Sequence, residues 1–185
     1  VPGTHDISLA QQTLDSLVQG KNPLSIPRFN KAEDDRYSQE QWDVLEQPVD
    51  IIVFEGWCLG AEAQGTDDLL KPINTLEKKY DAELVWRNYV NQQLQSHYFT
   101  LFNRVDLWIM LKAPRFDCVF NWRLQQEAKL RASIAGEKKT MDASEIKQFI
   151  QYYQRITEHL LKTLPNKVDY LFKLDEQRNI THSSL

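Results

Sequence analysis

Short apolar runs alternate along the chain with longer stretches that have a helical pattern. The apolar runs cover residues 49–54, 105–111 and 168–174. Helices are predicted over residues 6–19, 81–103, 115–132 and 143–163. Because the apolar runs are rich in β-branched residues, they predict strands buried on both faces, which is typical of parallel sheets. Strands separated by helices predict an α/β fold, with helices flanking a parallel sheet.

The residues around the first predicted helix indicate where it begins and ends. Asp6 or Ser8 is suited to cap its start, and Gly20 is suited to end it. Residues 22–48, which follow, are polar and contain several prolines, so they predict a long loop. Long loops inside compact domains are usually functional or disordered.

Composition and charge place the chain among ordinary globular proteins. The 185 residues carry a formal net charge of −4 and 42% of them are hydrophobic, which suits one domain over residues 1–185. The acidic balance argues against a broad nucleic-acid surface, although it leaves room for a local basic pocket. No apolar run approaches the roughly 20 residues that span a bilayer, so no membrane partner is expected.

Cysteine and histidine usage argues against disulfides and zinc. Cys58 and Cys118 lie far apart without CxxC spacing, which predicts free thiols in a reducing cytosol rather than a disulfide or a metal pair. The 4 histidines form neither HxxxH nor HExxH, the spacings that zinc sites use on helices. These features predict a cytoplasmic location.

A carboxylate directly follows the first apolar run. Glu55 stands at the end of this predicted strand, and Gly56 comes next. In open α/β sheets the ligand lies at the carboxyl ends of the strands, where a carboxylate can hold Mg²⁺ or its water. Gly56 would let the backbone pass close to a phosphate. The alternative is that Glu55 begins a solvated loop.

The stretch NWRLQQEAKLR, within the helix predicted over residues 115–132, carries Arg123, Lys129 and Arg131. Phosphoryl transfer needs positive charge around the moving group, and mobile arginines often supply it. Arg123 and Arg131 are separated by about 80° around a helix, so both could face one cleft. The alternative is a solvated charged face with i,i+4 pairs such as Glu127 with Arg131.

Further charged residues cluster in the first third of the chain. They are Arg28, Lys31, Asp34, Asp35 and Arg36 in the polar stretch, and His5 and Asp6 at the first helix. Mixed charge suits a small, anionic, hydroxylated substrate, because cations can bind its carboxylate and an acid can bind its hydroxyl. The alternatives are a polar surface loop and an aspartate cap preceded by an exposed histidine.

Seven stretches of the chain carry a family resemblance. They are VPGTHDISLAQQTLDSL, IPRFNKAEDDR, VDIIVFEGWCLGAEAQ, WRNYVNQQL, DLWIMLKAP, WRLQQEAKLR and LDEQRNI. Together, and in this order, they resemble the bacterial branch of the glycerate kinase family over nearly the whole chain. That family belongs to the P-loop kinases and is related to uridine kinase, pantothenate kinase and phosphoribulokinase.

The resemblance implies a fold and a reaction. The fold is that of a P-loop kinase, with a five-stranded parallel sheet and helices on both faces. The reaction is transfer of the ATP γ-phosphate, with Mg²⁺, to a hydroxyl of a small molecule, and glycerate is the expected acceptor. On this resemblance Glu55 supports the metal. Arg123 and Arg131 match the lid helix, over residues 115–132, that closes over the phosphates.

The resemblance also assigns the two ends of the substrate site. The stretch LDEQRNI, with Asp175, Arg178 and Asn179, matches the loop that passes near the adenine. Family motifs beside the acceptor match His5, Asp6, Lys31, Asp35 and Arg36. Within this set, Asp6 or Asp35 would orient the acceptor hydroxyl, unless an aspartate in the aspartate-rich turn that the family carries upstream does so.

The phosphate loop of that family, GxxxxGK[ST], does not occur in the 185 residues. In the family it lies upstream, after the first strand, and its lysine and hydroxyl hold the phosphates and the magnesium. Three strands are predicted here where the family has five. We therefore expect the chain to be the C-terminal part of a longer kinase, whose N-terminal segment or a partner chain completes the sheet.

Two other functions stay open at this point. The chain could be a non-catalytic module that binds a nucleotide or a partner. It could also belong to a kinase for a pantothenate-like or nucleoside-like hydroxyl, because acceptor choice depends on the shape of the pocket.

Overall fold

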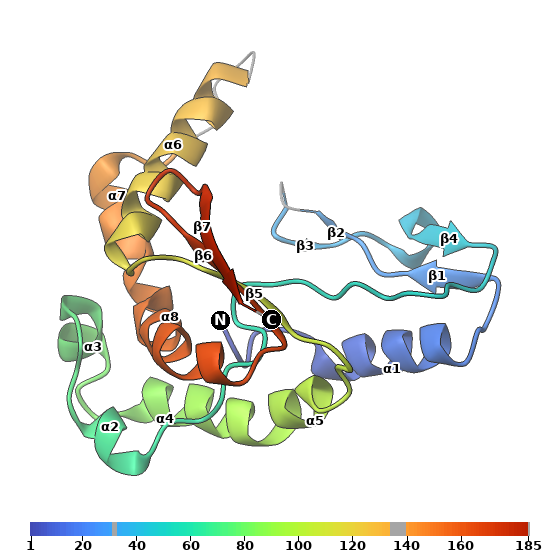
Figure 1. Cartoon of the computed structure of the whole chain (residues 1–185), viewed down its shortest axis with the longest axis horizontal. Helices are drawn as coiled ribbons and strands as arrows, with labels where there is room; N and C mark the ends of the chain where they lie inside the picture. The colour runs from blue at the N-terminus through green and yellow to red at the C-terminus, as the bar shows by residue number, and fades with distance from the viewer. Residues whose placement is uncertain (31–32, 134–139, 185) are drawn as a thin grey trace. The chain divides into compact units, whose positions relative to one another are not determined.

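The structure is a computed structural model that describes residues 1–30, 33–133 and 140–184 (Figure 1). The chain divides into two compact units. The smaller unit comprises residues 5–56, and the larger unit comprises residues 1–4 and 57–185. The single domain expected over residues 1–185 stays a prediction.

The smaller unit begins with helix α1 (Ile7–Val18), which confirms the helix predicted over residues 6–19. The side chain of Asp6 caps the helix by accepting a hydrogen bond of 3.0 Å from the backbone N–H of Leu9. Gly20 follows the helix with a φ of +65°, a left-handed conformation that favours glycine. The capping chemistry expected from the sequence is therefore present at the start of α1.

Short antiparallel strand pairs occupy the polar stretch that follows α1. Strand β1 (Leu24–Ile26) pairs with β4 (Asp43–Leu45), and β2 (Phe29–Asn30) pairs with β3 (Asp35–Arg36). A 3₁₀ turn, η1 (Gln39–Gln41), lies before β4. The long loop expected over residues 22–48 therefore contains local strand pairing.

The strand predicted over residues 49–54 is absent from the described structure. This segment has no strand hydrogen bonding, and its apolar side chains are exposed, with Ile51 80% and Val53 84% accessible. A β-branched run becomes a strand only where a neighbouring strand accepts its backbone hydrogen bonds. No described residue pairs with this run, so the prediction is wrong here and Glu55 does not end a strand.

The larger unit is rich in helices. They are α2 (Thr66–Leu70), α3 (Thr75–Tyr80), α4 (Val85–Gln93), the π-helical turn η2 (Leu94–Tyr98), α5 (Phe99–Phe102), α6 (Asp117–Ser133), α7 (Ala143–Phe149), α8 (Gln151–Thr163) and the 3₁₀ turn η3 (Leu164–Asn166). Helix α6 confirms the helix predicted over residues 115–132. The helix predicted over residues 143–163 is present as two helices, α7 and α8, separated by Ile150.

The helix predicted over residues 81–103 begins later than expected. Leu84 has a φ of +64°, a left-handed conformation that cannot belong to a right-handed helix, so α4 begins at Val85. The helical path then continues through η2 and α5 without a break. The existence of this helix is confirmed, and only its first turn differs from the prediction.

A three-stranded sheet lies in the larger unit, in the order β5–β6–β7. β5 (Ile109–Lys112) and β6 (Tyr170–Leu174) are parallel, with Ile109 opposite Tyr170. They confirm strands predicted over residues 105–111 and 168–174, with shorter bounds. β7 (Ile180–Ser184) adds antiparallel to β6, and the sequence pattern did not predict it. The described chain is therefore α/β, with a parallel pair at one side of a small mixed sheet.

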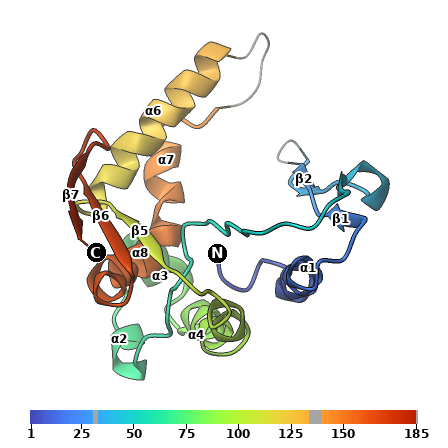
Figure 2. The same ribbon diagram turned by 45° about the vertical axis from the view of Figure 1, so that its right-hand side comes forward.

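Within the larger unit, helices α6 and α7 lie side by side, and α8 follows α7 (Figures 1 and 2). Buried apolar side chains come from the helices and from the sheet, among them Leu94, Tyr98, Leu101, Met110, Ile146, Ile156, Leu160 and Leu171. Among the described residues, no helix is both long enough and apolar enough to cross a membrane.

Cys58 and Cys118 are buried free thiols in the structure. Burial raises the pKa of the Cys58 thiol to about 11, so it stays protonated and unreactive at neutral pH.

A buried ion network ties the helices of the larger unit together. Its members are Glu77 at the start of α3, Asp81 after α3, Arg87 on α4 and Arg155 on α8. Arg87 Nε donates to Asp81 Oδ2 over 2.9 Å, and Arg155 Nη2 donates to Glu77 Oε2 over 2.7 Å. Other N–H groups of these two guanidiniums donate to backbone carbonyls, including that of Leu69. The network therefore anchors α3 and α4 to α8, the helix that carries Tyr153.

Candidate functional site

A groove of about 440 Å³ lies along helix α6 in the larger unit, and we call it the α6 groove. It is lined by Val119, Trp122, Arg123, Gln125, Gln126, Lys129 and Arg178. All but Arg178 come from α6. They lie on one side of this helix, because residues three, four and seven positions apart share a helix face. Val119 and Trp122 supply apolar surface, and the cations surround it. This arrangement suits a ligand with a flat apolar part and anionic groups.

Arg178 comes from the turn between β6 and β7, whose conformation Asp175 fixes. The Asp175 carboxylate accepts hydrogen bonds from the backbone N–H of Gln177 and from the backbone and side-chain N–H groups of Asn179, over 2.8–2.9 Å. The hydrogen bonds from Asn179 lower the pKa of Asp175. Arg178 has a φ of +71° in this turn. Asp175 and Asn179 thus shape the turn that presents Arg178 to the groove.

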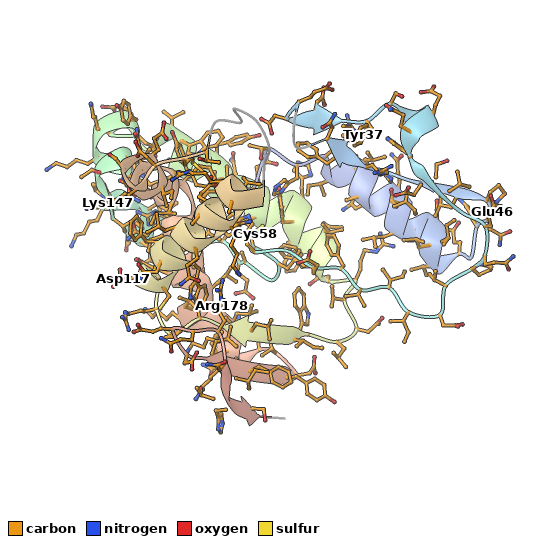
Figure 3. The ribbon with its side chains drawn as sticks, turned by 90° about the horizontal axis from the view of Figure 1, so that it is seen from above. Tyr37, Glu46, Cys58, Asp117, Lys147 and Arg178 are labelled. Atoms are coloured by element: carbon orange, nitrogen blue, oxygen red, sulfur yellow. The ribbon has the colours of Figure 1, made fainter. Side chains whose placement is uncertain are left out.

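The same turn is fastened to the first half of α6. Trp122 Nε1 donates to the Glu176 carbonyl over 2.7 Å, and Arg178 Nη2 donates to Gln125 Oε1 over 2.7 Å. The Arg178 guanidinium lies 5.8 Å from the centre of the Trp122 ring. Arg115 adds an ion pair of 2.6 Å to the Glu176 carboxylate. Figure 3 labels Arg178 and, at the start of α6, Asp117. One wall of the groove is therefore held in place before any ligand binds.

Arg123 stands between the α6 groove and helix α7. Its Nη2 forms an ion pair of 2.7 Å with Glu127, whose residue is only 3% exposed, and its Nη1 donates to Gln126. Its guanidinium lies 5.4 Å from the centre of the Phe149 ring on α7. Glu127 also accepts a hydrogen bond from the backbone N–H of Met141. A buried carboxylate thus orients the Arg123 guanidinium, and the Arg123 side chain also lines the α6 groove.

Arg131 takes a different position from the one expected for a cleft-facing residue. Its Nε donates to Thr140 Oγ1 over 2.9 Å, and its Nη2 donates to the Met141 carbonyl. It is not among the residues that line the α6 groove. The i,i+4 contact expected with Glu127 is not formed, because Glu127 pairs with Arg123 instead.

In the smaller unit, some of the residues assigned to the acceptor lie together. Arg36 Nη1 and Asp6 Oδ2 form an ion pair of 2.9 Å, so Asp6 both caps α1 and holds Arg36. Asp35 accepts a hydrogen bond of 2.7 Å from the backbone N–H of Arg36. His5 precedes the cap and is exposed. Lys31 lies outside the described residues.

Arg28 lies in a separate contact within the smaller unit. Its Nε pairs with Asp43 over 3.3 Å, and its guanidinium lies 5.1 Å from the centre of the Tyr37 ring. Both partners of this ion pair are well exposed, so the pair is open to exchange with a ligand. The structure thus brings Asp6 and Arg36 together and places Arg28 with Asp43.

Glu55 is exposed, and its carboxylate forms no hydrogen bond or ion pair with any described residue. A free carboxylate suits Mg²⁺, which is often held by one or two carboxylates plus the phosphates of a substrate. Within the part of the chain that the structure describes, no group of three or more His, Cys, Asp or Glu side chains could hold a metal ion. Among the described residues Glu55 therefore has no protein co-ligands for a metal, and a metal held there would need oxygens from a bound nucleotide.

Some residues of this site were not predicted from the sequence. Trp122 stands beside Arg123 in the WRLQQE stretch, and an aromatic residue on a charged helix was a usable signal. Phe149 and Tyr153 read as one apolar helix face, which gave no hint that they lie near Arg123. Glu127 was considered only as a partner of Arg131.

No protein-family model matches the chain. The chain is 31% identical over 173 residues to the uncharacterized kinase mug58 of Schizosaccharomyces pombe, a match that covers 90% of this chain and 60% of that protein. It is 28% identical over 193 residues to the chloroplastic D-glycerate 3-kinase of Arabidopsis thaliana, covering 96% of this chain and 39% of that protein. The chain thus spans 39–60% of the length of these two curated relatives, and both are named as kinases.

A solved structure has the same fold. The D-glycerate 3-kinase from Cryptococcus neoformans superposes with a TM-score of 0.75 at 23% identity, covering 99% of this chain and 68% of that one. The α/β arrangement of helices and small sheets is therefore shared with a D-glycerate 3-kinase structure.

Proposed function

We propose that the protein containing this chain transfers the γ-phosphate of ATP to a hydroxyl of D-glycerate. The observation that carries the proposal is the α6 groove, where Arg123 is oriented beside an aromatic surface held by Arg178. The relatives named as kinases support the reaction type, and the Arabidopsis relative supports the acceptor. The phosphate loop would be supplied by polypeptide outside these 185 residues.

The α6 groove would hold the nucleotide. A purine base has two flat apolar faces, and the ring of Trp122 with the neighbouring Val119 offers a surface on which it can stack. Arg178 and the turn shaped by Asp175 and Asn179 would close over the base. Lys129 and Arg123 border the same groove and would face the negative charge of the phosphates.

Catalysis would rest on positioning and electrostatics. Arg123, held by Glu127, would neutralise charge on the phosphoryl group without a large rearrangement of its own. Arg131 would reach the phosphates only after a movement of α6 that releases its guanidinium from Thr140 and Met141. Mg²⁺, when bound, would offset the negative charge of the phosphates, and Glu55 would help to hold it.

The acceptor would be held by residues of the smaller unit. Arg36 and Arg28 carry exposed guanidinium groups that could bind the carboxylate of D-glycerate. His5 and Lys31 would contribute to the same site on the family resemblance. Asp6 or Asp35 would orient the hydroxyl that attacks the phosphorus, because a carboxylate can accept its proton.

A phosphorylation assay tests the proposal. The full-length protein should convert ATP and D-glycerate to ADP and a phosphoglycerate only when Mg²⁺ is present. Pantothenate and uridine, offered at the same concentration, serve as controls for acceptors of other kinases. ADP formation with D-glycerate no faster than without an acceptor would contradict the proposal. ATP binding without turnover would favour the second candidate, a nucleotide-binding module.

Replacing Trp122 by leucine should weaken ATP binding about tenfold, since base–aromatic stacking contributes roughly 1–3 kcal/mol. The expected readout is a higher KM for ATP with little change in the KM for D-glycerate. Trp86→Leu on α4 is the matched control, because Trp86 is also partly exposed and stacked on a neighbouring tyrosine but lies outside the α6 groove. Equal effects of the two substitutions would remove Trp122 from the nucleotide site.

A further inference from the structure

Three aromatic rings and a guanidinium form a continuous row in the larger unit. The ring of Trp57 meets that of Tyr153 edge to face at 5.0 Å, and Tyr153 lies 5.0 Å from Phe149. Phe149 in turn lies under the guanidinium of Arg123. The row begins two positions after Glu55 in sequence and ends at the border of the α6 groove. None of the three aromatic residues has a role in the function proposed above.

Tyr153 carries an unused hydrogen-bond donor in this row. Its hydroxyl makes no hydrogen bond to any residue in the described ranges, although its ring is packed from two sides. Burial raises the pKa of Tyr153, and the positive charge of Arg123 acts in the opposite direction. The hydroxyl therefore keeps its proton at neutral pH and is available to donate.

Arg123 carries a second unused donor. Its Nε is buried and has no hydrogen-bond partner, and it is the one such side-chain atom found among the described residues. Its Nη1 and Nη2 are occupied by Gln126 and Glu127. A buried N–H without a partner costs free energy, and a bound water, ion or catalytic role is among the explanations for such a group in a native protein.

We propose that Tyr153 and Arg123 form an oxyanion subsite, in which the Tyr153 hydroxyl donates to an anionic oxygen of a substrate. The proposal rests on the function proposed above and adds a substrate-contacting residue to it. The oxyanion belongs to a tetrahedral phosphoryl group or to a planar carboxylate. Either group has anionic oxygens that can accept hydrogen bonds from a guanidinium and a hydroxyl. Trp57 and Phe149 fix the plane of the tyrosine ring, so the direction of its O–H bond is limited before the substrate arrives.

Two features favour a substrate contact over simple packing. A phenylalanine at position 153 would make the same ring contacts with Trp57 and Phe149, so packing alone does not need the hydroxyl. Gln126 and Glu127 occupy Nη1 and Nη2 of Arg123, and its Nε keeps a donor without a partner among the described residues. The hydroxyl and the guanidinium thus offer donors to a group that the described residues do not supply.

The test compares Tyr153→Phe with Tyr152→Phe in the full-length protein. Tyr152 is the adjacent residue on α8, is exposed, and has no contact in the aromatic row, so it is a matched control. Calorimetric titrations with inorganic pyrophosphate and, separately, with D-glycerate measure oxyanion binding without turnover. Tyr153→Phe should weaken binding of one probe about tenfold, as expected when a hydrogen bond to a charged group is lost, while Tyr152→Phe should leave both unchanged.

The outcomes distinguish the source of the oxyanion and the two proposals. A loss confined to pyrophosphate assigns the subsite to a phosphoryl group, and a loss confined to D-glycerate assigns it to the acceptor carboxylate. Unchanged binding in Tyr153→Phe, or no binding of either probe by the unmodified protein, overturns the subsite. Binding that depends on Tyr153 in a protein without kinase activity would leave the subsite standing and reject the proposed reaction.

A stability measurement excludes a purely structural role. Tyr153→Phe should melt at nearly the same temperature as the unmodified protein, because the ring contacts are kept. In turnover assays it should raise the KM of the affected substrate more than it lowers kcat. A drop in melting temperature that accompanies an equal loss of binding for both probes would show that Tyr153 acts through packing, and would overturn the proposal.

Discussion

Replacing Arg87 by methionine is expected to destabilise the larger unit by about 3–5 kcal/mol, the cost of leaving a buried charge without its partner. The substitution keeps much of the side-chain volume but removes the hydrogen bonds to Asp81 and to the Leu69 carbonyl. Asp81 and Glu77 would then be buried with fewer donors. Since small domains unfold with a free energy of about 5–15 kcal/mol, such a loss should shift a urea unfolding midpoint clearly.

Lys78→Met is the control for this experiment. Lys78 lies on α3 next to Glu77, is exposed, and takes no part in the buried ion network, so its loss should change the unfolding free energy by less than about 0.5 kcal/mol. If Arg87→Met and Lys78→Met unfold at the same urea concentration, the network does not contribute to the stability of the fold.

If the proposed reaction is correct, Arg123→Ala should lower the turnover of the full-length protein about a hundredfold or more, the usual effect of removing a donor that stabilises developing charge. The structure adds a second effect that the sequence did not suggest. Because Glu127 is buried and pairs with Arg123, the substitution should also cost about 1–3 kcal/mol of stability. Steady-state kinetics and urea unfolding on the same preparation measure the two effects.

A second substitution separates the two effects of Arg123→Ala. Adding Glu127→Gln removes the unpaired buried charge, so the double variant should recover stability but not turnover. Lys147→Ala, which removes an exposed cation from the neighbouring helix α7, should change neither quantity. Recovery of turnover in the double variant would mean that Arg123 acts only by supporting the fold and not as a lid residue.

The elements with strong local signals could be predicted from the sequence. Helix α1 has a capping aspartate and a terminating glycine, and α6 follows a proline, so their bounds came within two or three residues. The parallel pair of β5 and β6 also followed from its apolar composition. β7 escaped prediction because its residues, Ile180–Ser184, are mostly polar and are held by pairing with β6.

The run over residues 49–54 shows the limit of such reasoning. Its composition favours a strand, but strand formation depends on a neighbour, and no described residue supplies one. The role of Glu55 in holding Mg²⁺ was predicted from its place at the end of that strand. Without the strand, the support that remains is that its carboxylate is exposed and has no partner among the described residues. Composition alone could not reveal this, because it does not specify which other segments are present to pair.

The candidate site was predictable in its charges and not in its geometry. Arg123 and Arg178 were recognised from the sequence, and the structure brings them to one groove. Spacing on a helix could not show that Arg123 rests on Phe149, since α7 is distant in sequence and packs against α6 only through the tertiary fold. For the same reason Tyr153 appeared as an ordinary core position.

Strand β5 has one further consequence for work with the chain in solution. It lies at the edge of the sheet in the described structure, and the side chains of Ile109 and Leu111 are 59% and 64% exposed. An open, apolar strand edge is a template on which another chain can add. Association of copies through this edge is therefore expected when the chain is handled alone at high concentration, and it is a property separate from the stability of the fold.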